Sequence, residues 1–330
     1  MSGELTPVLS VVVPTYNRQE RLLRALDALA GQDVEVPYEI VVVSDGSTDG
    51  TDEALEGLDL GVPLVTARQE NAGPSAARNR AVELARGEIL VFVDDDIIAD
   101  RGLLSAHLAA QRAHEGGVVV TGPMLTPDDH RMTAWVRWEQ DRLERQYDDL
   151  AAGRYEATGR LFYTGNASVP RALVVDAGGF DTRFRRAEDL ELGLRMLDAG
   201  AAFRFVPAAR GFHYAERSFA AWERIPYEYG VNEITFASRW PELIPMNRRH
   251  WHDSPLLGKV VAAAGAFVPG AGSVLAVLLR PLARSETRVG QLALSMLYKV
   301  RFTIGLRDGL GNRRALWRLL RFGTADLAER

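Results

Sequence analysis

The chain has 330 residues, of which 47% are hydrophobic and 25% are charged. These values predict a globular protein with one large domain and additional segments. The absence of cysteine excludes disulfides, thiolate metal sites and a cysteine nucleophile, and it fits a reducing compartment. The formal net charge of −5 hides an uneven distribution along the chain.

The two ends of the chain differ in charge. Residues 245–330 contain 14 Lys or Arg and 5 Asp or Glu, a net charge of +9, which leaves −14 for residues 1–244. An acidic body followed by a basic region indicates two functions, so we divide the chain between residues 244 and 245. Residues 1–7 have neither a basic start nor an apolar segment, so we expect no secretion signal and a cytoplasmic protein.

Short apolar segments alternate with helical patterns in the first half of the chain. The apolar segments predict strands at residues 8–13, 38–43, 64–67, 89–93 and 118–121. The patterns between them predict helices at residues 19–30, 51–58, 74–86 and 103–115. Asn17 is the expected N-cap of the first helix. This alternation predicts an α/β fold, with a doubly wound, mostly parallel sheet and flanking helices.

The pattern changes after residue 122. We expect a charged, aromatic helix at residues 135–152, an apolar segment at 161–169, a helix that begins near Glu188 and a strand at 203–206. No internal repeat and no low-complexity tract interrupts these elements.

Three consecutive carboxylates, Asp94, Asp95 and Asp96, follow the apolar strand at residues 89–93. Unpaired ionised groups are very costly to bury, so such a cluster needs a counter-charge. In an open α/β sheet the carboxyl ends of the strands face the ligand, and three acids there suit a hard divalent cation that binds phosphate oxygens. The alternative is a solvated acidic turn that caps the next helix.

Six short motifs resemble, in order and in spacing, those of the family 2 glycosyltransferases, which have the GT-A fold. The motifs lie at residues 11–17, 43–49, 71–79, 94–96, 178–181 and 188–189. Each motif alone is weak, but together they extend the resemblance over about residues 9–214. It implies an inverting, nucleotide-sugar-dependent enzyme, with a nucleotide-sugar half at about residues 1–122 and an acceptor half at about residues 123–244.

For the donor, the resemblance assigns the D-x-D role to Asp94 and Asp96, which would hold Mn²⁺ or Mg²⁺ with the diphosphate. His213 would be a further metal ligand, and its alternative is a hydrogen-bonded structural histidine. A bound divalent ion would neutralise the charge that develops on the leaving diphosphate. The resemblance also implies a set of donor-binding residues: Pro14, Thr15, Tyr16, Asn17, Asp45, Arg78, Asp94 and Asp95.

Taken without the resemblance, several of these residues have ordinary interpretations. Asp45 and Asp49 would be turn and N-cap residues, and Arg78 would lie on the surface of a helix.

For the acceptor, a direct displacement requires a carboxylate that takes the proton of the acceptor hydroxyl. The resemblance assigns this role to Asp189, with Glu188 beside it as an orienting residue or acceptor ligand. Gly165 and Asn166 are expected to border the acceptor site. The alternatives are an acidic helix N-terminus for Glu188 and Asp189, and a simple bend within a strand for Gly165.

Processive synthases of this superfamily carry a Q-x-x-R-W motif, and the nearest segment here, residues 236–240, lacks the Gln. We therefore expect a non-processive hexosyl- or pentosyltransferase that acts on a cell-envelope glycan, a lipid-linked acceptor or a natural product. The alternatives are a sugar nucleotidyltransferase, although no G-x-G-T-R-like loop follows the first strand, and a non-catalytic nucleotide-sugar-binding scaffold. The acidic body argues against nucleic-acid binding.

The C-terminal region combines apolar and basic residues. Residues 260–279 contain no charge, but Pro269 and Gly270 interrupt them, so two helices on a membrane or against the protein are favoured over a span. Residues 292–320 interleave apolar side chains with Arg and Lys, as an interfacial segment does. The candidate partners are an anionic surface at the inner face of the cytoplasmic membrane and a second copy of the chain, which would form a homodimer through this region.

Overall fold

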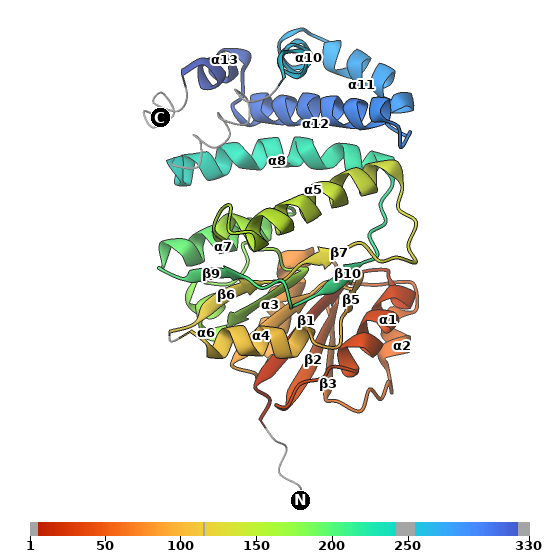
Figure 1. Cartoon of the computed structure of the whole chain (residues 1–330), viewed down its shortest axis with the longest axis vertical. Helices are drawn as coiled ribbons and strands as arrows, with labels where there is room; N and C mark the ends of the chain where they lie inside the picture. Colours follow the sequence, from red (N-terminus) through yellow and green to blue (C-terminus); the bar gives the residue numbers. More distant parts are fainter. Residues whose placement is uncertain (1–5, 115, 242–254, 323–330) are drawn as a thin grey trace, which may run out of the picture. The chain divides into compact units, whose positions relative to one another are not determined.

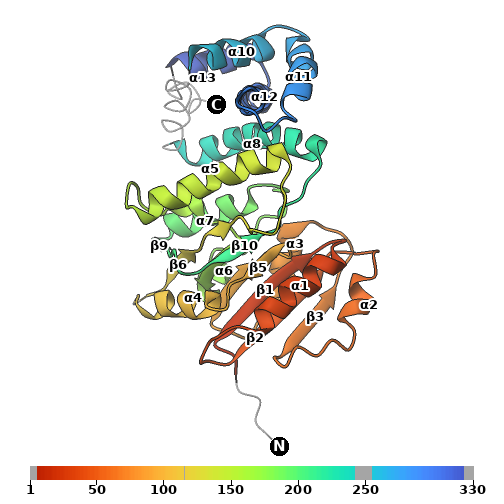
Figure 2. The same ribbon diagram turned by 45° about the vertical axis from the view of Figure 1, so that its right-hand side comes forward.

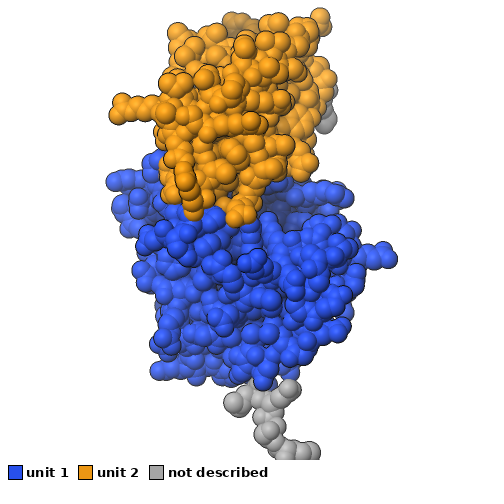
Figure 3. All heavy atoms as spheres, turned by 90° about the vertical axis from the view of Figure 1, so that its right-hand side faces the viewer, with its two compact units in different colours: residues 1–130, 142–214 blue, residues 131–141, 215–330 orange. Residues whose placement is uncertain are grey.

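The computed structural model describes residues 6–114, 116–241 and 255–322. The chain forms two compact units: the first contains residues 1–130 and 142–214, and the second contains residues 131–141 and 215–330 (Figure 3). The division between residues 244 and 245 that the charge predicts falls outside the described residues, and it stays a prediction.

The first unit is built on strands that follow the expected order along the chain. They are β1 Leu9–Thr15, β2 Tyr38–Ser44, β3 Leu64–Arg68, β4 Ile89–Val93, β5 Ile97–Ala99, β6 Val118–Thr121, β7 Met124–Leu125, β8 Asn166–Pro170, β9 Ala202–Phe205 and β10 Gly211–His213. Seven of them form a sheet in the order β3-β2-β1-β4-β8-β6-β9, and three form a small sheet in the order β5-β10-β7 (Figure 1). In the large sheet β3, β2, β1 and β4 are parallel, and β8 is antiparallel to both β4 and β6.

Helices cover both faces of the large sheet. They are α1 Gln19–Ala30, α2 Thr51–Leu55, α3 Pro74–Leu84, α4 Leu103–Arg112, α5 Ala134–Ala151, the 3₁₀ turn η1 Gly159–Leu161, α6 Arg171–Asp176 and α7 Glu188–Asp198. The first residues of α5 belong to the second unit. The expected α/β fold with a mostly parallel sheet is confirmed.

The alternation of side chains along β1 shows how the two faces are filled. Val11 packs in one buried cluster with Leu22 and Leu26 of α1, whereas Val12 packs in the other cluster with Ala77 of α3. Successive side chains of a strand point to opposite faces, so a continuous apolar run is expected where both faces are buried. Helices α1 and α4 contribute to the first cluster, and α3, α6 and α7 contribute to the second (Figure 2).

The loop before α1 differs from the expectation. Asn17 has a φ of 52°, and its side-chain oxygen accepts a hydrogen bond from the backbone N of Thr48 at 2.7 Å. Helix α1 begins after Arg18, and Asp49 accepts a hydrogen bond from the backbone N of Gln19 at 3.0 Å. The predicted N-cap was wrong, because Asn17 joins two loops while a residue from the loop after β2 caps the helix.

The second unit is helical. Its helices are α8 Phe219–Arg239, α10 Leu256–Phe267, α11 Ala271–Leu282, α12 Arg288–Gly309 and α13 Arg313–Phe322. The uncharged segment at residues 260–279 forms parts of α10 and α11 with a break at residues 268–270, so the prediction of two helices is confirmed. Among the residues described, no helix has both the length and the apolar character that crossing a membrane requires.

Glycines let α8 and α12 approach each other closely. A Cβ atom at Gly230 would overlap the carbonyl of Phe302, and one at Gly305 would overlap the carbonyl of Tyr227. This contact brings the two longest helices of the second unit together.

A buried carboxylate joins three helices of the second unit. Glu223 of α8 accepts hydrogen bonds from Nε of Arg280 in α11, at 2.9 Å, and from Nε of Arg301 in α12, at 2.8 Å. The two guanidinium groups compensate its charge, so Glu223 serves the packing of this unit.

Candidate active site

The carboxyl ends of three parallel strands place polar residues along one edge of the large sheet. β1 ends at Thr15, Asp45 follows β2, and Asp94 follows β4. Because β2 and β4 both pair with β1, the three strand ends lie side by side. This is the edge at which open α/β sheets bind their ligands.

Two acids of the triplet share one arginine. Nη1 of Arg18 lies 2.8 Å from Oδ1 of Asp95 and 2.8 Å from Oδ2 of Asp96, and Oγ1 of Thr15 donates to Oδ2 of Asp95 at 2.8 Å. Both carboxylates are buried, so the alternative of a solvated acidic turn is wrong for this pair. Burial raises the pKa of Asp95 to about 6 against the opposing charge of Arg18, and the charge of Asp96 adds to the rise.

The third acid is joined to Glu188 of α7 by a second arginine. Arg78 of α3 is buried, and its Nη2 lies 2.8 Å from Oδ1 of Asp94 while its Nη1 lies 2.8 Å from Oε1 of Glu188. Although burial opposes the charge, the carboxylates of Asp94, Glu188 and Asp189 raise the pKa of Arg78. Arg78 is therefore a buried link within the site, and its alternative as a surface helix residue is wrong.

Asp189 lies in the first turn of α7, next to this link. The backbone N of Leu190 donates to its Oδ1 at 2.8 Å. Burial raises the pKa of Asp189 to about 7, the charge of Glu188 acts in the same direction, and Arg78 opposes both. A carboxylate whose pKa lies near neutrality is suited to taking a proton at physiological pH.

Two site residues follow strained backbone positions. Among the described residues, the non-glycine residues with positive φ are Asn17, at 52°, and Ala187, at 60°. Asn17 precedes Arg18, and Ala187 precedes Glu188. Side chains with a Cβ atom rarely adopt this conformation, which persists where the surroundings hold it and is enriched at functional sites.

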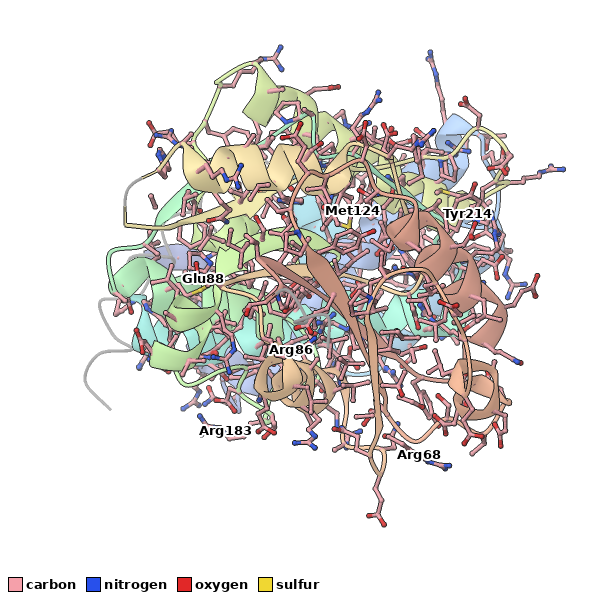
Figure 4. The ribbon with its side chains drawn as sticks, turned by 90° about the horizontal axis from the view of Figure 1, so that it is seen from below. Arg68, Arg86, Glu88, Met124, Arg183 and Tyr214 are labelled. Carbon is pink, nitrogen blue, oxygen red and sulfur yellow. The ribbon has the colours of Figure 1, made fainter. Side chains whose placement is uncertain are left out.

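The pairing of β10 with β5 places His213 beside the triplet. His213 is opposite Ile97, the first residue of β5, and its Nε2 lies 3.7 Å from Oδ1 of Asp96. The backbone N of Tyr214, labelled in Figure 4, donates to the carbonyl of Asp96 at 2.9 Å. The expected metal ligands Asp96 and His213 are therefore neighbours, although they are 117 positions apart in the sequence.

These groups suit a divalent ion that binds together with phosphate. In the part of the chain that is described, no group of three His, Asp or Glu side chains is placed to hold a metal ion by itself. Ions such as Mg²⁺ use one or two protein carboxylates and complete their coordination with substrate phosphates and water. The carboxylate of Asp96 and the imidazole of His213 fit such an ion.

Asp45 organises the loop in front of α3. Its carboxylate accepts hydrogen bonds from Nε2 of Gln69 at 2.7 Å, from the backbone N of Ala72 at 2.9 Å and from the backbone N of Gly73 at 2.8 Å. These bonds connect the motif at residues 43–49 to the motif at residues 71–79. Its expected contact with the donor base stays a prediction.

The other expected donor residues lie around the end of β1. Pro14 and Thr15 belong to the strand itself, and the hydroxyl group of Thr15 donates a hydrogen bond to Asp95. Tyr16 is 48% exposed and Asn17 is also exposed, so both side chains are accessible to a ligand. Their contacts with a donor stay predictions.

The two expected acceptor residues differ. Gly165 lies next to the triplet, because a Cβ atom there would be 3.2 Å from Oδ2 of Asp94. Asn166 is completely buried: its Nδ2 donates to the carbonyls of Pro123 and Ala209, and its Oδ1 lies 2.9 Å from Nε2 of His107. The buried side chain of Asn166 supports the start of β8, and its expected place at the border of the acceptor site stays a prediction.

Two site residues were missed in the sequence. Arg18 pairs with both Asp95 and Asp96, but a single arginine after Asn17 forms no recognisable sequence motif. Tyr163 donates to Oε1 of Gln146 at 2.9 Å, and burial together with the charge of Asp189 raises its pKa. Tyr163 could have been predicted as a site residue, because it lies between η1 and β8 in the segment that also contains Gly165.

Comparisons with known proteins show which proteins this chain resembles. The sequence profile described as Glycosyl transferase family 2 matches residues 10–177. The uncharacterized glycosyltransferase YfnE of Bacillus subtilis (strain 168) is 32% identical over 243 residues, which is 59% of this chain and 62% of that protein. The validoxylamine A glucosyltransferase of Streptomyces hygroscopicus subsp. jinggangensis is 32% identical over 216 residues, or 58% of this chain and 51% of that protein. The chain thus matches about half to three fifths of the length of these relatives.

A solved structure has the same fold. The mannosyltransferase PcManGT from Pyrobaculum calidifontis, in complex with GDP-Man and Mn²⁺, superposes with a TM-score of 0.64 at 23% identity, covering 91% of this chain and 87% of that chain. The chain therefore has the GT-A fold. The chain belongs to glycosyl transferase family 2, whose profile covers half of it.

Proposed function

We propose that this chain is a metal-dependent, inverting and non-processive glycosyltransferase that moves a hexose or pentose from a nucleoside-diphosphate sugar to a hydroxyl group. The observation that carries the proposal is the pair of contacts by which Arg78 joins Asp94 to Glu188, beside Asp189. This link connects the acids expected to bind the donor with the acid expected to activate the acceptor.

On the donor side, the acids at the sheet edge would bind the diphosphate and Asp45 would accept from the base. Mn²⁺ or Mg²⁺, held by Asp96, Asp94 and His213, would neutralise the charge that develops on the diphosphate as the glycosidic bond breaks. The neighbour described with GDP-Man and Mn²⁺ supports this class of donor and ion.

On the acceptor side, Asp189 would take the proton of the attacking hydroxyl. The bond between the acceptor oxygen and the anomeric carbon forms as the bond to the diphosphate oxygen breaks, so the anomeric configuration inverts. Glu188 is held by Arg78 and raises the pKa of Asp189, which keeps the base ready near neutral pH. Gly165 would border the acceptor through its position next to Asp94.

A donor screen tests this proposal. The full chain is incubated with UDP-, GDP- and dTDP-sugars and Mn²⁺ or Mg²⁺, and the released products are measured with and without a chelator. We expect release of a nucleoside diphosphate from one donor, which stops in the chelator. Formation of a nucleoside triphosphate and a sugar 1-phosphate when pyrophosphate is added would indicate a sugar nucleotidyltransferase, and donor binding without any product would indicate a non-catalytic scaffold.

The second unit supports a lipid-linked acceptor. Most of the large hydrophobic residues that are exposed in the described chain lie on its helices. Those in α10, α11 and α12 are Leu256, Leu257, Val260, Val274, Val277, Leu278, Leu282, Val289 and Leu292. Helix α11 buries the small residues Gly272 and Ala276 and exposes Val274, Val277, Leu278 and Leu282, while Leu279 is partly buried. This is the reverse of a helix that packs its large apolar side chains into a protein core.

The charge around this apolar surface favours an anionic membrane as its partner. Residues 255–322 contain the acids Glu286 and Asp308 and otherwise only basic charged residues. A second copy docked through the same surface would bring like charges together, whereas a membrane surface offers opposite charges and an apolar interior. The inner face of the cytoplasmic membrane is therefore the proposed location for the enzyme with a lipid-linked acceptor.

Vesicle binding distinguishes these partners. We expect the chain to bind vesicles that contain anionic lipid and to dissociate in high salt. Replacing Val277 and Leu278 by Glu should weaken binding, whereas Val175→Glu, at an exposed site in the first unit, should not. If the chain does not bind vesicles and sediments as a dimer, the apolar surface is the interface of a homodimer. The acceptor would then be soluble, such as a glycan or a natural product, and the validoxylamine A relative supports the latter class.

A further inference from the structure

Arg18 occupies the carboxylate that the proposed metal site needs. Its Nη1 is 2.8 Å from Oδ2 of Asp96, while the other oxygen of Asp96 faces Nε2 of His213 at 3.7 Å. An ion held by Asp96 and His213 would lie within a few ångströms of the guanidinium group. Two cations so close repel each other, so Arg18 and the ion compete for Asp96.

We propose that Arg18 is an internal counter-ion that holds Asp96 in the metal-free enzyme and gives it up when a divalent ion binds with the donor. This inference rests on the proposed function, because it takes Asp96 as a metal ligand. It assigns different roles to the two acids that contact Arg18.

Asp95 is the anchor of the arginine. Its side chain is 6% exposed, and it also accepts a hydrogen bond from Thr15, which holds it next to the end of β1. Asp96 is the exchangeable partner, because it alone of the two has a histidine beside its second oxygen. In this proposal Asp95, the middle acid of the triplet, holds Arg18 and does not contact the metal.

The geometry allows the arginine to move while its backbone stays in place. Asn17 is held by hydrogen bonds to Ser47 and Thr48, which fix the chain just before Arg18. The side chain of Arg18 is 39% exposed, whereas that of Asp96 is 10% exposed. The cation therefore lies on the outer side of the pair and can turn toward solvent or toward a phosphate group, which arginine binds well.

This exchange makes metal binding depend on the donor. Without a donor, an entering ion meets the positive charge of Arg18. With a donor, the diphosphate offers Arg18 a new partner and supplies oxygens to the ion. The enzyme should therefore bind Mn²⁺ weakly alone and more strongly with a nucleoside diphosphate.

Mn²⁺ binding to the donor-free chain tests the inference, with electron paramagnetic resonance as the readout. Arg18→Gln should bind Mn²⁺ at least about tenfold more tightly than the parent, because removing a charge a few ångströms away is worth at least that much. Arg18→Lys keeps the charge and should stay within about threefold of the parent. Arg80→Gln, which removes an exposed arginine paired with Glu83 on α3, should change nothing.

Asp96→Asn separates this inference from the proposed function. Loss of Mn²⁺ binding in Asp96→Asn, combined with unchanged or weaker binding in folded Arg18→Gln, would overturn the role of Arg18 and leave the metal site intact. Unchanged binding in Asp96→Asn would refute the metal site itself.

If Arg18→Gln does not fold, a measurement on the parent chain can test the proposal instead. The side-chain nitrogen signals of Arg18, assigned by their absence in Arg18→Lys, should shift in a saturable way as diamagnetic Mg²⁺ and the donor's nucleoside diphosphate are added. Signals that stay unchanged at saturation would overturn the proposal.

Discussion

Buried carboxylates meet arginines in both units of the molecule, but in opposite proportions. In the second unit a single carboxylate, Glu223, is shared by two arginines. In the first unit Arg18 and Arg78 each bridge two carboxylates, and Asp189 lies beside them as a fifth acid. A cluster with enough cations holds helices together, whereas an excess of acid at a sheet edge leaves a demand for a cation from outside. The same residue types thus serve packing in one unit and, in the proposed function, ligand binding in the other.

Removing Asp96 from the acidic cluster should have the largest effect on activity. Asp96→Ala is expected to lower sugar transfer about 10³-fold or more, because the charge on the leaving diphosphate loses several kcal/mol of stabilisation. Donor binding in the presence of Mn²⁺ should weaken in parallel. Steady-state kinetics and calorimetric donor titration measure both effects. Full activity of this variant, or of the parent in excess chelator, would refute the metal-binding role.

The cluster of Glu223 with Arg280 and Arg301 should contribute to the free energy of unfolding. Glu223→Gln leaves two guanidinium groups without their carboxylate, and we expect a loss of about 1–3 kcal/mol in the free energy of unfolding, because water still reaches both arginines. Chemical denaturation of the full chain measures this loss.

A matched variant removes a partly exposed carboxylate on the same helix. Glu228→Gln breaks the contact with Arg224, which is 69% exposed, and should cost less than about 0.5 kcal/mol. Equal losses for the two variants would contradict the structural role of the Glu223 cluster.

The excess of acid should also make the stability depend on pH. The pKa of Asp189 is raised to about 7 in the folded chain, against an ordinary value of about 4. The folded state therefore binds more protons than the unfolded state between these values, and the stability from this group falls as the pH rises through 7. Asp189→Asn cannot ionise, so its melting temperature relative to the parent should be higher at pH 8 than at pH 5. An equal difference at both pH values would show that Asp189 ionises normally.

The sheet and the triplet were predictable because their signals are local. Val11 and Val12 lie in a continuous apolar run, which suits a strand buried on both faces, and the acids follow such a run directly. Alternation of strands and helices then limits the topology to a mostly parallel sheet.

The ion pairs were not predictable, because they depend on contacts between distant segments. Arg18 reaches the triplet across 77 positions and Arg78 reaches Glu188 across 110 positions. The pattern of residues says which groups carry charge, but only the folded chain says which charges meet. The burial of Asn166 was missed for the same reason, since its hydrogen-bond partners come from other strands and loops.

Turnover of Asp189→Asn tests the central claim most directly. Asparagine keeps the size of the side chain but cannot take the proton of the acceptor, so turnover should fall about 10²–10⁴-fold at saturating donor and acceptor. Donor affinity should stay near that of the parent, and the parent should give a product of inverted anomeric configuration. Near-normal turnover of the variant, or a product that keeps the configuration of the donor, would contradict the assignment of Asp189 as the base of an inverting transfer.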